Sequence, residues 1–105
     1  MNKAQLVEAI NKKAAEQGIN HSKKVIEEVL STTLEVIVDA VASGEKVTLV
    51  GFGSFEKRER KEREGRNPKT GAKMMIPATF VPAFSAGKTF KERVHPEGAD
   101  FEEEE

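Results

Sequence analysis

The sequence predicts an α+β protein: a helical body at the N-terminus, then a short β-sheet with a long β-ribbon arm, and a last helix. Apolar residues recur at helical spacing over residues 1–45 and alternate at strand spacing from residue 46 onward. A charged segment without apolar residues follows, which marks an arm that packs on no core. The 105 residues suffice for one small domain, which we expect to span residues 1–96.

Two capped helices are expected in the helical body. Asn2 can cap the first helix, with Gln5 three residues later as its reciprocal partner, and Gly18 ends this helix. Ser22 caps a second helix, which continues to a stop at Gly44. The second helix is apolar on more than one side, at Val25, Ile26, Val29, Leu30, Leu34, Val36, Ile37, Val38, Ala40 and Val41. In so short a chain such a helix packs most simply on the first helix and on a second subunit, so we expect a homodimer.

Residues 46–84 predict the sheet and the arm. Val47 and Leu49 alternate in parity with their neighbours before the chain turns through two glycines, Gly51 and Gly53, as in a strand with a bulge or a sharp turn. This strand is expected to continue into the arm.

The arm is predicted because one of its strands has no apolar side chains and the other contains two prolines. Residues 56–64 contain no apolar side chain at either parity, so neither face of this strand can be buried. The returning segment contains Pro77 and Pro82, which confine it to unpaired edges. We therefore expect a two-stranded arm that stays mobile until a ligand orders it. A C-terminal helix is expected at residues 85–94, beginning at Ser85.

Charge is distributed unevenly along the chain, although the net charge is only −1. Residues 46–96 carry twelve Lys or Arg against five Asp or Glu, and the first 45 residues carry five against seven. Residues 97–105 carry six acids and no Lys or Arg, which predicts an acidic, disordered tail. A basic body with an acidic tail indicates a polyanionic ligand and a segment that moderates access to it.

Cations gather on the arm. Residues 56–73 hold eight Lys or Arg and four Glu. Arg58 and Arg60 share one parity, and four of the cations gather toward the tip: Arg63, Arg66, Lys69 and Lys73. This placement suits a ribbon that lies along a phosphate backbone. A solvated hairpin whose charges protect its exposed edges is the alternative.

Cations also occur at three predicted helix starts, where the helix dipole disfavours them. These are Lys3 after the Asn2 cap, Lys23 and Lys24 after Ser22, and Lys88 after Ser85. Free backbone N–H groups together with a Lys form a suitable site for a phosphate oxygen. Three such sites favour a phosphate-bearing ligand over chance.

Two segments carry a family resemblance: VGFGSFEKRERKEREGRNPKTG, from Val50 to Gly71, and VPAFSAGKTFKERV, from Val81 to Val94. They resemble the bacterial HU/IHF family of DNA-bending histone-like proteins, and its HU branch in particular. The resemblance implies that two chains intertwine into a helical body with two β-arms that wrap double-stranded DNA. It also implies that the arms lie in the minor groove.

The resemblance also implies residue roles. Pro68 at the arm tip matches the wedge that enters between base pairs, for which a rigid side chain without an N–H is suited. The family's DNA contacts match Lys3, Lys23, Arg58, Arg60, Arg63, Arg66, Asn67, Pro68, Lys88 and Lys91, and the charge of the tip adds Lys69 and Lys73. The aromatic core between subunits matches Phe52, Phe55 and Phe84. Met74 and Met75 replace more polar residues, and the acidic tail has no counterpart in a typical HU.

Other functions have less support. With two His, no Cys and no G-x-S-x-G motif, no catalytic residue, cofactor or metal is expected. A site-preferring regulator of the IHF type, an RNA-binding or DNA-binding histone-like protein moderated by its tail, and a protein-interaction module that uses the tail remain alternatives. No apolar run is long enough to span a membrane. We expect non-sequence-specific, architectural DNA binding that compacts or organises the nucleoid, in the bacterial cytoplasm or in a plastid.

Overall fold

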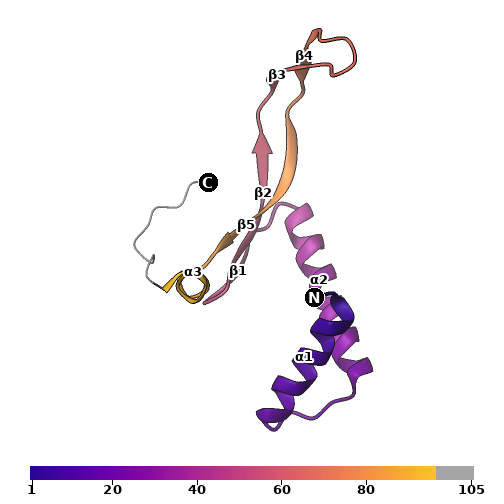
Figure 1. Ribbon diagram of the computed structural model, residues 1–105, viewed down its shortest axis with the longest axis vertical. Helices are drawn as coiled ribbons and strands as arrows, with labels where there is room; N and C mark the ends of the chain where they lie inside the picture. The colour runs from indigo at the N-terminus through magenta and orange to yellow at the C-terminus, as the bar shows by residue number, and fades with distance from the viewer. Residues whose placement is uncertain (97–105) are drawn as a thin grey trace. The chain divides into compact units, whose positions relative to one another are not determined.

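The computed structural model describes residues 1–96 and confirms the α+β class (Figure 1). The elements in chain order are α1 (Lys3–Glu16), α2 (Lys23–Ala42), β1 (Val47–Leu49), β2 (Gly53–Arg60), β3 (Arg63–Arg66), β4 (Lys73–Ile76), β5 (Thr79–Ala86) and α3 (Lys88–Val94). The chain divides into two compact units, Met1–Asp39 and the part from Ala40 onward, so the boundary falls within α2. The predicted acidic tail, residues 97–105, lies outside the described residues.

The first unit is an α-hairpin whose boundaries follow local hydrogen bonds. The Asn2 side chain accepts from the Gln5 N–H at 2.9 Å and the Gln5 side chain accepts from the Asn2 N–H at 2.8 Å, which confirms the predicted cap. Gly18, with φ +81°, takes the left-handed conformation that ends α1. The Ser22 hydroxyl accepts from the Val25 N–H at 3.2 Å, so α2 begins where it was predicted to begin.

The second unit is built on a three-stranded antiparallel sheet in the order β1-β2-β5. β1 and β2 are joined by a tight turn, in which the Phe52 N–H donates to the Leu49 carbonyl at 2.9 Å and Gly51 has φ +84°. β5 is an edge strand, which explains how Pro82 is accommodated opposite Lys57.

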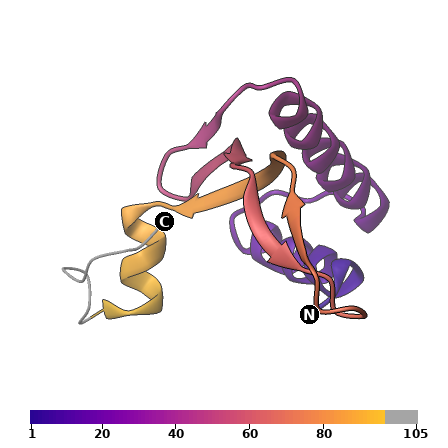
Figure 2. The same cartoon turned by 90° about the horizontal axis from the view of Figure 1, so that it is seen from above.

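The arm is one ribbon in two stretches. The β2–β5 ladder runs from the pair Gly53 and Ala86 to the pair Arg60 and Thr79, and β3 and β4 then form a separate two-stranded sheet. Pro77 lies between β4 and β5, where it has no N–H to donate to a ladder. Figures 1 and 2 both show β3 and β4 at the end of the ribbon away from α3.

The predicted start of the C-terminal helix is wrong by three residues. Ser85 and Ala86 lie in β5, paired with Ser54 and Gly53, and α3 begins at Lys88. The Gly87 N–H donates to the Phe52 carbonyl at 2.8 Å, which holds the chain against the β1–β2 turn before it can become helical. Strand pairing therefore prevails over the capping tendency of Ser85.

One chain buries little apolar surface of its own. Among residues 1–96, Val7 and Val41 are the only buried apolar side chains. The large apolar side chains that remain exposed include Val25, Val29, Leu34, Val36, Val38, Phe52 and Phe84. No helix in the described part of the chain is both long and apolar enough to cross a membrane.

Candidate nucleic-acid interface

The arm tip is a turn that presents Pro68 on a fixed backbone. The Asn67 side-chain oxygen accepts from the Lys69 N–H at 2.8 Å, so the proline is enclosed in a local ring. The Asn67 N–H donates to the Ala72 carbonyl at 2.9 Å, and its carbonyl accepts from the Gly71 N–H at 2.7 Å. Asn67 thus holds the turn through both its backbone and its side chain, and Pro68 is exposed.

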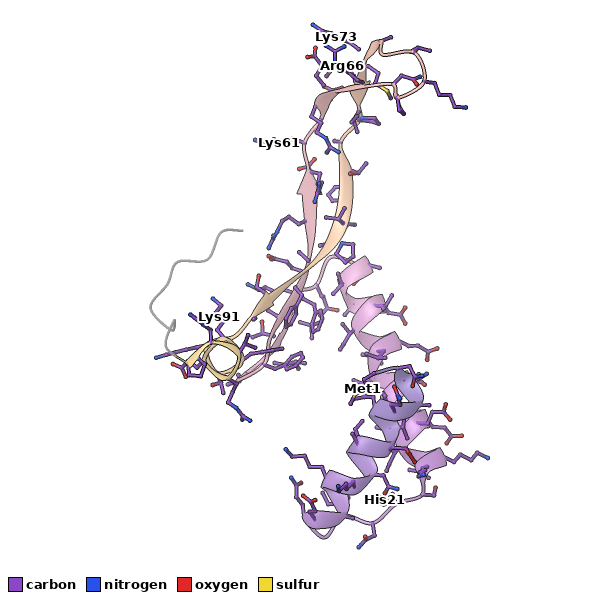
Figure 3. The ribbon with its side chains drawn as sticks, viewed as in Figure 1. Met1, His21, Lys61, Arg66, Lys73 and Lys91 are labelled. Carbon is purple, nitrogen blue, oxygen red and sulfur yellow. The ribbon has the colours of Figure 1, made fainter. Side chains whose placement is uncertain are left out.

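Two cations face each other where the ribbon enters the tip. Arg66 and Lys73 are directly paired across β3 and β4, and Figure 3 shows both at the end of the ribbon. The Arg66 guanidinium donates to the Gly71 carbonyl at 3.0 Å, which ties it to the turn. Like charges directly opposite each other in a ladder destabilise it, so this pair gains from an anion held between them.

The β2–β5 ladder places Arg58 and Arg60 on one face, opposite Val81 and Thr79, as their shared parity predicted. Arg58 pairs with the Glu56 carboxylate on the same face at 2.9 Å. The hydrogen bond from Arg58 holds the pKa of the Glu56 carboxyl below its usual value. This face is therefore charged and polar along most of its length.

The opposite face carries a pair that sequence reasoning missed. The Lys57 ammonium lies 4.7 Å from the centre of the Phe80 ring, in cation–π geometry. The same ammonium donates to the Ala42 carbonyl at the end of α2, at 3.5 Å. Lys57 is thus engaged in holding the base of the arm to the helix end, and only its parity relative to Arg58 hinted at a separate role.

Two of the predicted contacts, Lys88 and Lys91, lie on α3. The Lys88 ammonium lies 4.0 Å from the Glu92 carboxylate, and its side chain is 86% exposed. The Lys91 side chain is half-buried. Because Ser85 lies in a strand, it does not cap α3; Gly87 takes the capping position without a side-chain hydrogen bond. Lys88 is the first residue of the helix, with an exposed ammonium, and its phosphate contact stays a prediction.

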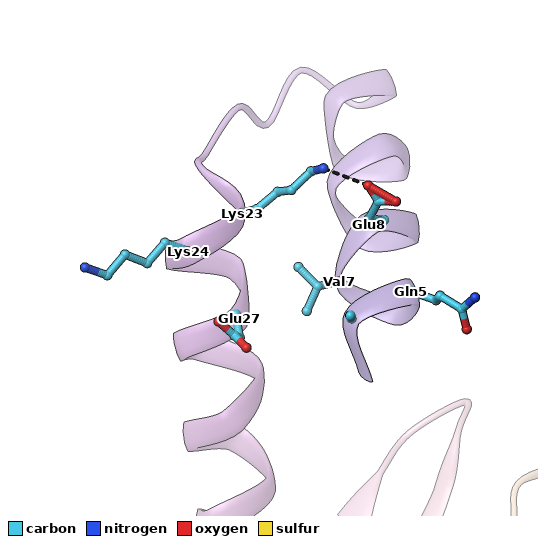
Figure 4. Close-up of a pocket in the computed structure, with 7 residues that line it drawn as sticks. Gln5, Val7, Glu8, Lys23, Lys24 and Glu27 are labelled. Carbon is cyan, nitrogen blue, oxygen red and sulfur yellow. Dashed lines mark hydrogen bonds and ion pairs between the residues drawn. The ribbon is translucent and has the colours of Figure 1, made fainter. Parts of the chain in front are cut away.

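Lys3 and Lys23 lie in the other compact unit. The Lys3 ammonium donates to the Ser31 hydroxyl. The Lys23 ammonium pairs with the Glu8 carboxylate at 2.7 Å across a hollow of about 500 Å³ between α1 and α2, and Figure 4 shows this pair as a dashed line. This hydrogen bond keeps the pKa of the Glu8 carboxyl below its usual value. Both amines therefore have partners within the chain that a phosphate would have to replace.

An aromatic cluster occupies the base of the sheet. The ring of Phe84 lies 4.9 Å from Phe55 and 5.5 Å from Phe52, measured between ring centres. Phe90 of α3, which the family resemblance did not include in the aromatic core, joins them at 5.3 Å from Phe52. These rings are within the range of favourable aromatic pairs. In one chain, Phe52 and Phe84 nevertheless remain 45% and 43% exposed.

Within residues 1–96, no group of three His, Cys, Asp or Glu side chains is placed to hold a metal ion. What the geometry provides is an extended cationic ribbon that ends in an exposed proline, which suits a long polyanion better than a small substrate. Fold and site together define a small α+β protein with a cationic β-arm.

Comparisons with known proteins agree with a protein that binds a long polyanion. Residues 1–95 match the family model described as Bacterial DNA-binding protein. The chain belongs to this family, in its HU branch. It is 65% identical to DNA-binding protein HU of Synechocystis over 92% of this chain and 98% of the relative. An HU–DNA cocrystal structure from Anabaena aligns with TM-score 0.84 and 62% identity, covering 91% of this chain and 99% of that chain. HU from Thermotoga maritima aligns with TM-score 0.60 and 37% identity, over 90% of this chain and 98% of the other.

Proposed function

We propose that this chain is a non-enzymatic architectural protein that binds duplex DNA without marked sequence preference, and bends it with its β-arms in the minor groove. The observation that carries the proposal is the arm itself: an extended ribbon with cations on its length and an exposed proline at its tip. A similar chain, 62% identical, was crystallised with DNA. By this function the protein belongs in the nucleoid of a bacterium or a plastid.

The contacts divide into clamps and a wedge. Exposed cations of the arm hold phosphates on either side of the insertion point, at Arg60, Arg63, Arg66, Lys69 and Lys73, and Arg58 joins them. Such contacts position the protein but carry no sequence information. Pro68 inserts between two adjacent base pairs. The hydrogen bonds of Asn67 keep the turn that carries Pro68 rigid during this insertion.

The remaining contacts come from the body. We assign phosphate contacts to Lys3 and Lys23 near the starts of α1 and α2, and to Lys88 and Lys91 on α3. Lys23 must give up its 2.7 Å pair with Glu8 to make one, which costs little because both side chains are mostly exposed.

The working form is a homodimer. Among residues 1–96, two buried apolar side chains are too few to stabilise a chain of this length. Each compact unit exposes apolar surface of its own: the first along α2, and the second at the half-exposed rings of Phe52 and Phe84. A second copy of the chain would cover such surfaces, because a symmetric dimer buries the same residues from both subunits. Phe52, Phe55 and Phe84 then form the core between the subunits.

Fluorescence anisotropy across a salt titration, together with energy transfer along a doubly labelled duplex, tests the proposal. Arg60→Ala should weaken binding and flatten the salt dependence by about one phosphate contact per chain. Pro68→Ala should lengthen the end-to-end distance of the bound duplex while changing affinity much less. Lys13→Ala, which removes one charge from the last turn of α1, is the matched control and should change neither.

Some results would count against the proposal. An unchanged duplex distance with Pro68→Ala would remove the wedge. Equal affinity for duplex RNA would point to an RNA-binding protein, and strong discrimination between duplex sequences would point to a site-preferring regulator.

A further inference from the structure

The upper arm, the ribbon formed by β3 and β4, carries two consecutive exposed methionines. Met74 is 45% exposed and Met75 is 55% exposed, both in β4. The only other methionine is Met1. A thioether that solvent reaches is open to two-electron oxidation by hydroperoxides, whereas a core methionine is protected.

The register decides what surrounds each sulfur. Met74 is paired with Gly65, so no side chain opposes it from β3. A Cβ at position 65 would lie 2.7 Å from the end of the Ile76 side chain, so a larger residue there would displace Ile76. On this face Met74 and Ile76 form the apolar part of the upper arm.

Met75 is on the other face, paired with Glu64. The neighbouring pair on that face, two positions away, is Arg66 and Lys73. Met75 is therefore an apolar side chain beside two of the cations assigned to DNA phosphates.

We propose that Met74 and Met75 form a redox modification site, at which oxidation by a hydroperoxide weakens the hold of the arm on DNA. The sulfur attacks the terminal oxygen of the hydroperoxide, the O–O bond breaks, and an S–O bond forms. The proton of that oxygen passes to the other peroxide oxygen, which leaves as water or an alcohol, so the thioether is oxidised by two electrons and the peroxide is reduced by two. The proposal deepens the proposed function and rests on it.

The physical effect follows from the new oxygen. A sulfoxide is polar and a strong hydrogen-bond acceptor. At Met75 it competes with phosphate for the N–H groups of Arg66 and Lys73 and brings negative partial charge to the DNA backbone. At Met74 it makes an apolar contact surface polar, so the contact is lost. Because sulfoxides can be reduced enzymatically, the change is reversible.

Hydrogen peroxide is the probe, used on the full chain. The extent of reaction is followed in the tryptic peptide 74–88, which begins after Lys73 and contains both methionines, and Met1 reports reactivity elsewhere. We expect one oxygen per sulfur and DNA binding about fivefold to tenfold weaker, as for the loss of one modest apolar contact at Met74 and the weakening of one phosphate contact beside Met75. Bound DNA should slow the oxidation of this peptide but not of Met1. Methionine sulfoxide reductases should restore affinity.

The matched control is the double variant Met74→Leu, Met75→Leu, which keeps volume and apolar character but has no sulfur to oxidise. Its affinity for DNA should be the same before and after peroxide treatment. Undiminished binding by the doubly oxidised protein, an equal loss in the double variant, or a lowered melting temperature of the oxidised protein would each overturn the proposal. Failure of the untreated protein to bind DNA would instead overturn the proposed function.

Discussion

Phe52→Ala examines whether the aromatic cluster is a core that two chains share. The Phe52 ring centre lies 6.4 Å from Phe55, 5.5 Å from Phe84 and 5.3 Å from Phe90. With Phe52 45% exposed, one chain buries roughly 100 Å² of it, worth about 2.5 kcal/mol at about 25 cal/mol per Å². If a second chain covers the rest, the loss should rise to about 3–5 kcal/mol per chain.

The assay is urea denaturation at several protein concentrations. The wild type should unfold at a midpoint that rises with concentration, because dissociation accompanies unfolding. Phe80→Ala is the control, since Phe80 is 61% exposed and its described partner is the Lys57 ammonium at 4.7 Å; it should cost about 1 kcal/mol. Equal losses in the two variants, or a midpoint independent of concentration, would refute the shared core.

Three more predictions follow from particular residues. Gly53→Ala should destabilise the protein by about 1–3 kcal/mol, because the new Cβ would lie 2.6 Å from the Phe84 ring and from the Ser85 carbonyl; unchanged urea stability would contradict this. The pKa of Glu56 is lowered by Arg58, so its ion pair stabilises the fold above the usual carboxyl pKa range and stops doing so as pH falls through the lowered value. Any difference in the free energy of unfolding by which the wild type exceeds Glu56→Gln should therefore vanish in acid. A difference that grows as the pH falls would contradict this pH dependence. Replacing the six acids of residues 97–105 by Gln or Asn changes the formal charge from −1 to +5 and should tighten DNA binding, chiefly at low salt. Identical binding curves across a salt titration would mean that the tail does not moderate access.

The local features of the fold could be predicted because each depends on a few neighbouring residues. Asn2 and Gln5 set the start of α1 through bonds that span three positions, and Gly18 ends the helix because it adopts positive φ readily. The positive charge of the arm and its tip at Pro68 likewise depend on residues that are neighbours in the sequence. These features, with the family resemblance, were sufficient to indicate the class of ligand.

Long-range contacts were decided only by the tertiary structure. The start of α3 was misplaced because Ser85 pairs with Ser54 across the sheet, and no local pattern reveals that pairing. The same holds for Lys57, whose partners Phe80 and Ala42 lie far from it in the sequence. Register has this effect because a shift of one residue moves every side chain to the other face of a ribbon. The sequence therefore determined which charges the arm carries, and strand pairing determined which of them lie opposite one another, as Arg66 and Lys73 do.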